Sequence, residues 1–159
     1  MINDERLDFE NVYTVQVYKD IYAFRYLTKD ESTVIKYSIT ASDDILITER
    51  TTFNPPKASP SLVTFRNQYI MVTGGINQKK FDVYKSVEWY DIKTNQWSNV
   101  APLNTPRSNH SSCVLKDIIY VFCGYNGTSG WLNSIEKIDA GEFADKEWGT
   151  QWEFLMVQS

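Results

Sequence analysis

The chain has few of the residues from which enzyme centres and metal sites are built. Its 159 residues include one histidine, His110, and two cysteines, Cys113 and Cys123. These three lack the close ligand spacing of zinc sites. The G-x-S-x-G elbow, the G-x-G-x-x-G loop and the Walker phosphate loop are absent from the sequence. We therefore expect no metal, no cofactor and no enzymatic activity.

Long apolar runs and an excess of positive charge are also missing. No run approaches the roughly 20 apolar residues that span a bilayer, and residues 1–6 lack the apolar segment of a signal peptide. The net charge of −4 argues against a dedicated nucleic-acid binder. We expect a soluble, cytoplasmic protein that binds neither membranes nor nucleic acids.

The two cysteines are not expected to form a disulfide. If Lys116 and Asp117 form a hairpin turn, Cys113 lies opposite Tyr120 and not opposite Cys123. A disulfide would have to bring the two Cα atoms within about 7 Å against that register. We predict two free thiols, buried or half-buried.

What the chain does contain is a series of short runs of β-forming residues. The clearest series lies between Ser61 and Arg107, where Gly, Pro and Asn separate the runs. Alternating apolar and aromatic residues between such breaks predict antiparallel strands. The four predicted strands are 61–66, 69–73, 86–92 and 96–100. Polar loops 76–85 and 93–95 separate the last three.

The same series recurs along the chain. Residues 115–124 repeat the pattern of 65–74, and 134–139 repeat 86–91, after 50 and 48 residues. A weaker copy precedes both. We predict roughly three repeats, at about 12–53, 58–103 and 108–157. Residues 1–11 are interpreted as a lead-in, and 140–147 as a helical turn or an acidic loop.

The middle repeat resembles a kelch repeat. It has Gly74 and Gly75 at a strand end, then Tyr90, then Trp97. The third repeat has Gly124-Tyr125 in place of two glycines, Ile138 in place of the tyrosine, and a displaced Trp152. The first has Arg25-Tyr26 and no tryptophan. The resemblance implies an all-β fold, a partial β-propeller of about three four-stranded antiparallel kelch-like blades.

The hallmark residues of the repeats are interpreted as scaffold. Glycine permits a sharp turn where backbones crowd, and Tyr or Trp can fill the gap between two blades. The residues concerned are Gly74, Gly75, Tyr90, Trp97, Gly124 and Trp152.

Three repeats are fewer than the four to eight blades that usually close a propeller. The chain could be a fragment of a longer propeller, could associate with another copy to close a ring, or could be a free-standing arc. A sandwich or barrel of short strands is a further alternative. A WD40 propeller is disfavoured because no repeat ends in Trp-Asp.

Resemblance to kelch proteins implies binding of a protein partner. We expect a scaffold or adaptor that binds a protein or peptide, acidic or phosphorylated, through loops on one rim. The alternatives are a fragment of a propeller enzyme and a purely structural set of blades. The copper site of kelch-like oxidases needs two histidines, and this chain has one. The candidate contacts are Lys79, Lys80, Phe81, Tyr84, Arg107, His110, Tyr125 and Trp131, with Lys57 and Lys85 as further basic residues.

Overall fold

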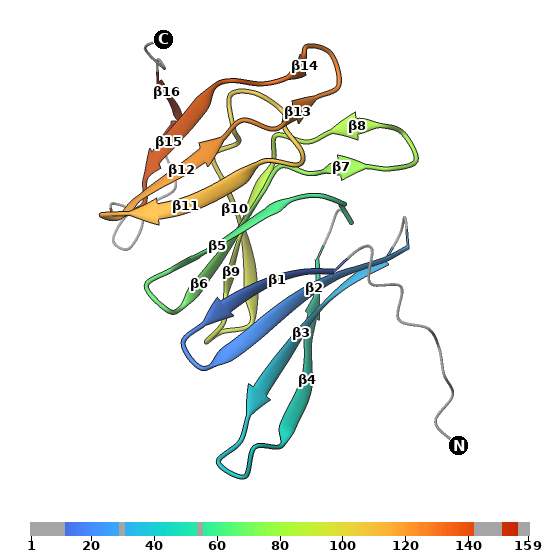
Figure 1. The fold of residues 1–159 in the computed structure, drawn as a ribbon, viewed down its shortest axis with the longest axis vertical. Coiled ribbons are helices and arrows are strands. Elements are labelled where there is room, and N and C mark those ends of the chain that lie inside the picture. The colour runs from blue at the N-terminus through green and yellow to red at the C-terminus, as the bar shows by residue number, and fades with distance from the viewer. Residues whose placement is uncertain (1–11, 29–30, 54–55, 142–150, 156–159) are drawn as a thin grey trace.

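Three four-stranded antiparallel sheets follow one another along the chain, as Figure 1 shows. The computed structural model describes residues 12–28, 31–53, 56–141 and 151–155. The all-β prediction with four-stranded blades is confirmed. The lead-in 1–11 and most of the insertion 140–147 lie outside the described residues.

The first sheet has the longest strands. Its order is β1-β2-β3-β4, and Tyr18, with a φ of 57°, helps to turn the chain between the first two strands. A bulge interrupts the pairing of the last two strands at Val34 and Ile35. The strands are β1 (Val12–Val17), β2 (Asp20–Thr28), β3 (Glu31–Ile39) and β4 (Ile45–Thr52).

The second and third sheets are built alike from shorter strands. The second contains β5 (Ser61–Phe65), β6 (Tyr69–Thr73), β9 (Val87–Asp91) and β10 (Gln96–Val100). The third contains β11 (Ser111–Leu115), β12 (Ile118–Phe122), β15 (Ile135–Asp139) and β16 (Glu153–Leu155). In both, each strand pairs with the next of the four along the chain.

The two repeats differ in the length of their first turn. Phe65 pairs with Tyr69 across a three-residue turn, whereas Leu115 pairs with Ile118 across a two-residue turn. Beyond this turn, equivalent residues of the second and third sheets are therefore separated by one residue fewer in the sequence than before it.

Because this turn is shorter in the third sheet, the sequence-based alignment of the glycine pair is wrong by one residue. The structural equivalents of Gly74 and Gly75 are Cys123 and Gly124, and not Gly124 and Tyr125. Their backbones agree, with φ of 57° for Gly74 and 55° for Cys123, and 106° for Gly75 and 98° for Gly124. Cys123 thus occupies a glycine position.

Aromatic side chains fill the space between the first and second sheets. Trp97 packs with Phe24 and Phe53, at centroid distances of 6.1 and 5.9 Å. Tyr90, fully buried, lies 5.0 Å from Trp97 and 6.3 Å from Tyr22. The hallmark residues Tyr90 and Trp97 therefore hold two neighbouring blades together.

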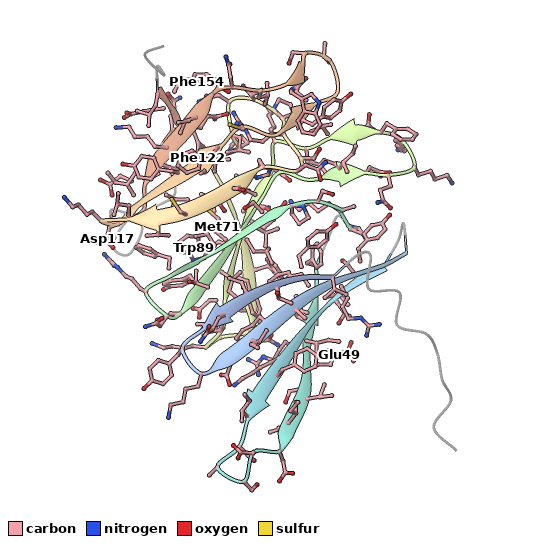
Figure 2. The ribbon with its side chains drawn as sticks, viewed as in Figure 1. Glu49, Met71, Trp89, Asp117, Phe122 and Phe154 are labelled. Atoms are coloured by element: carbon pink, nitrogen blue, oxygen red, sulfur yellow. The ribbon has the colours of Figure 1, made fainter. Side chains whose placement is uncertain are left out.

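A second apolar core lies between the second and third sheets. It includes Met71 and Trp89, labelled in Figure 2, together with Ile119, Ile138 and Trp152. The Trp152 indole Nε1 donates a hydrogen bond to the backbone oxygen of Ala101, at 2.8 Å. The displaced tryptophan of the third repeat therefore still contacts the preceding blade.

The cysteines follow the predicted register but not the predicted burial. Cys113 pairs with Tyr120, and neither cysteine forms a disulfide. Both are exposed, so the expectation of buried thiols is wrong. Cys113 lies on the face of the third sheet that is turned away from the second, and described sheets cover only the opposite face.

Candidate partner-binding rim

Each of the last two blades has a short hairpin after its second long strand. The first hairpin joins β7 (Ile76–Asn77) to β8 (Asp82–Val83), and the second joins β13 (Tyr125–Asn126) to β14 (Gly130–Trp131). The two hairpins project from the same end of the molecule (Figure 1). We call residues 76–83 and 125–131 together the hairpin rim. From the sequence, both segments are expected to be loops, because two-residue strands are too short to show alternation.

An asparagine side chain stabilises each hairpin turn. Asn77 Oδ1 accepts hydrogen bonds from the backbone nitrogens of Lys79 and Lys80, at 3.0 and 3.1 Å. Asn126 Oδ1 does the same for the two residues at equivalent positions, at 2.8 and 3.1 Å. Such bonds let asparagine mimic a backbone turn. The recurrence of Asn77 as Asn126 was a sequence signal that could have revealed both hairpins.

A shallow cleft of about 320 Å³ separates the two hairpins. The hairpins approach closely at its floor, since a Cβ atom on Gly127 would lie 3.5 Å from Val83 Cγ2. Polar and apolar groups line it together: Phe81, Asp82, Val83, Pro106, Asn126, Gly127 and Thr128.

Two large aromatic side chains of the rim are exposed to solvent. Phe81 and Trp131 are each 76% exposed. Tyr125 packs edge-on against Trp131, with ring centroids 5.5 Å apart. Phe81 also has a φ of 57°, an unfavourable conformation for a bulky side chain. Strained backbone and uncovered aromatic surface are both typical of binding sites.

The exposed charge of the first hairpin is mainly positive. Lys79 and Lys80 are both exposed near its tip, with Asp82 as the exposed acid beside them. Lys85, also exposed, follows the hairpin. These lysines and the two aromatic residues are the predicted contacts that the structure brings together at the surface.

Arg107 is not part of this surface, which corrects the sequence-based assignment. Its guanidinium is fully buried, and Nη2 donates to Glu136 Oε1 at 2.6 Å. Nη1 donates to the backbone oxygens of Cys123 and Ser134, at 2.7 and 3.2 Å. Sequence reasoning missed this burial because a basic residue in a polar, proline-containing linker is usually exposed.

Lys57 is buried in the same way in the preceding blade. It forms an ion pair with Glu88 and donates a hydrogen bond to Ser86 Oγ at 3.1 Å. Burial lowers the pKa of Lys57, and the Glu88 carboxylate partly offsets this effect. Two buried ion pairs therefore hold the linkers that lead into the second and third blades.

His110, a candidate partner contact from the sequence, is also buried, with 8% of its surface exposed. Its Nε2 forms a 2.8 Å hydrogen bond with Thr73 Oγ1. Burial, together with the nearby charges of Arg107 and Lys57, lowers its pKa to about 3. The imidazole is thus neutral near pH 7 and has a structural role.

Tyr84, the remaining predicted contact, is half-buried at the base of the first hairpin. Its hydroxyl accepts a hydrogen bond from Asn77 Nδ2 at 3.3 Å. Its ring also lies 6.0 Å from the Lys57 ammonium. Tyr84 therefore joins the hairpin to the buried ion pair beneath it.

Other kinds of site find no support in the part of the chain that the structure describes. No group of three or more His, Cys, Asp or Glu side chains is placed there to hold a metal ion. Among the same residues, no helix is long and apolar enough to cross a membrane.

Comparison with known proteins relates this architecture to one family. Residues 58–104 and 106–142 match the Kelch motif. Human Kelch-like protein 4 is 48% identical over 54 residues, which is 34% of this chain and 7% of that protein. Kelch-like protein 26 of Danio rerio is 31% identical over 88 residues, 54% of this chain and 14% of that protein. The Influenza virus NS1A-binding protein homolog of Xenopus laevis is 38% identical over 67 residues, 42% and 10% respectively.

A solved structure shows the same fold. YjhT superposes with a TM-score of 0.71 at 16% sequence identity, and the match covers 91% of this chain and 50% of that one. The chain thus spans half of this solved chain, and a seventh or less of the three relatives described above.

Proposed function

Because the chain belongs to the kelch-repeat family, we propose that it is a protein-interaction module, a scaffold or adaptor that binds its partner through the hairpin rim. The observation that carries this proposal is the exposure of Phe81 and Trp131, each 76%, on two neighbouring hairpins. Kelch-like relatives and a relative whose name records binding to the influenza virus NS1A protein support a protein as the partner.

The chemistry of the rim favours an acidic peptide segment that also carries an apolar side chain. Aromatic residues and basic side chains are frequent anchors of protein interfaces. Phe81 and Trp131 offer apolar contact area, and Lys79 and Lys80 offer ammonium groups for carboxylates or phosphates. The hairpins are held by internal hydrogen bonds, so little further ordering is needed on binding.

We propose a binding role and not a catalytic one, in the cytoplasm. The single histidine is buried and neutral, so it is poorly placed to transfer protons with a substrate. Both cysteines are free thiols, which agrees with a reducing compartment.

The test begins with capture of a partner by the immobilised chain. The partner is then truncated to the shortest peptide that still binds. We expect the double change Lys79→Glu and Lys80→Glu, and separately Phe81→Ala with Trp131→Ala, to weaken peptide binding about tenfold or more. Raising the salt concentration should weaken wild-type binding but affect the lysine variant less.

Lys93→Glu with Lys116→Glu is the matched control. Both lysines are exposed and lie in strand turns at the opposite end of the sheets. The control reverses the same number of charges away from the rim. Equal binding by the wild type and both rim variants would refute the proposed site.

A further inference from the structure

Two sheet faces at the ends of the described arc have no neighbouring sheet (Figure 1). The first, which we call open face 1, is the face of the first sheet turned away from the second. It carries Ile21, Tyr37, Ile39, Ile45 and Ile47. The second, open face 3, is the face of the third sheet turned away from the second. It carries Cys113, Leu115, Ile118, Tyr120, Phe122 and Ile135.

Open face 1 has the pattern of a face that packs against another blade. Ile21, Tyr37 and Ile47 lie directly opposite one another across three strands. The equivalent row in the second sheet is Ile70, Tyr90 and Trp97. That row is covered by the first sheet, and its Ile70 and Tyr90 are fully buried. In open face 1, by contrast, Ile47 is 61% exposed.

Open face 3 has the pattern of the complementary face. Tyr120 and Lys137 are cross-strand neighbours, as are Tyr22 and Lys36 in the first sheet. Tyr22 is buried because the second sheet covers it, and its ring centroid lies 6.3 Å from that of Tyr90.

More apolar surface surrounds Tyr120. Phe122, labelled in Figure 2, stacks on it with ring centroids 6.2 Å apart. Leu115, on the same face, is exposed.

The two open faces are therefore the two halves of a contact that the chain already makes internally. Open face 3 corresponds to the Tyr22 side of the contact between the first and second sheets, and open face 1 corresponds to the Tyr90 side. We propose that a second copy of this chain occupies each open face, with open face 1 of one copy packed on open face 3 of the other. Tyr37 then lies against Tyr120, as Tyr90 lies against Tyr22.

A two-fold pair forms both contacts at once and leaves neither face exposed. Two copies supply six blades, which is within the range that closes a propeller. The rows proposed to meet, with Tyr37 on one copy and Tyr120 on the other, lie on sheet faces outside the hairpin rim. Dimerisation and partner binding can therefore be tested with separate variants.

Sedimentation velocity on the purified chain tests the proposal. We expect a concentration-dependent dimer of twice the 18.5 kDa chain mass. Ile47→Lys should raise the dimer dissociation constant at least tenfold, because it places a charge in the contact. Leu46→Lys is the matched control, since Leu46 is the adjacent residue, is 57% exposed, and points to the opposite face of the same strand.

Variants of open face 3 extend the test. Tyr120→Glu should also prevent dimerisation, and Leu115→Glu, at an exposed position, repeats the test where folding is least at risk. Mixing the Ile47→Lys and Tyr120→Glu chains should restore a dimer, because one of its two contacts is then fully wild type. A chain that stays monomeric at every concentration, or a dimer that none of these variants weakens, would overturn the proposal.

Discussion

Arg107 and Glu136 form an ion pair in which both side chains are fully buried, with 2.6 Å between Nη2 and Oε1. The pair of Lys57 and Glu88 repeats this arrangement one blade earlier. Glu136 also accepts hydrogen bonds from the backbone nitrogens of two linker residues, at 2.6 and 3.1 Å. The pair thus fixes the linker between the second and third blades to the third sheet.

We predict that Arg107→Met lowers the free energy of unfolding by about 3–5 kcal/mol, because it leaves the Glu136 carboxylate buried without a cation. Urea unfolding followed by tryptophan fluorescence measures the change. The control is Glu153→Gln, which breaks the partly exposed pair of Lys137 and Glu153 and should cost less than about 1 kcal/mol. Similar losses in the two variants would contradict the structural role of Arg107.

Substitutions at the glycine position of the repeat are predicted to change stability in opposite directions in the two blades. Cys123→Gly should stabilise the protein by about 1 kcal/mol, because a non-glycine residue is strained at its φ of 55°. Gly74→Ala should destabilise it by more than that, since the new Cβ would lie 2.2 Å from the Arg107 backbone oxygen. Thermal unfolding of both variants checks the signs, and a stabilised Gly74→Ala chain would show that the blades are not packed as described.

Stability should depend on pH through His110. Its pKa is lowered from the ordinary 6.5 to about 3 in the folded chain, so below pH 6.5 the unfolded chain binds a proton that the folded chain does not. The free energy of unfolding should therefore fall as the pH decreases from 6.5 towards 3, by up to about 1.4 kcal/mol per pH unit from this group.

His110→Gln is the comparison for this pH dependence, because glutamine cannot titrate but can still form a hydrogen bond to Thr73. The variant should have a shallower decrease over the same range, with the carboxylates contributing equally to both chains. If the free energy of unfolding fell equally steeply with pH in both chains, the pKa of His110 would not be lowered in the folded state.

Trp97 should be far more important for stability than Trp131. Trp97 packs against Phe24, Phe53 and Tyr90 between two blades, so Trp97→Ala should cost about 3–5 kcal/mol. Trp131 is 76% exposed, and Trp131→Ala should change stability by less than about 0.5 kcal/mol. Chemical denaturation of the two variants, each lacking one tryptophan, makes this comparison.

The strands could be predicted because their signal is local. Alternation identified 69–73 and 96–100 with the observed bounds, and the turn at Lys116 and Asp117 gave the correct pairing of Cys113 with Tyr120. The alignment of the glycine pair failed because one turn has three residues and its equivalent has two, a difference visible only in the strand pairing.

The candidate site was harder to predict because burial depends on contacts distant in sequence. Arg107 is buried by groups on Cys123, Ser134 and Glu136, and no feature of its own linker indicates this. Lys79, Lys80, Phe81 and Trp131 could be located on a rim because they lie in connections between strands.

The thiol of Cys113 has a practical consequence for the study of assembly. It lies beside Tyr120 on open face 3 and is exposed in the single chain. Because reaction with alkylating reagents requires access to the sulfur, its labelling rate reports whether that face is bare or shielded. The natural sequence thus carries its own footprinting probe on this face, so no cysteine has to be introduced into the contact for the measurement.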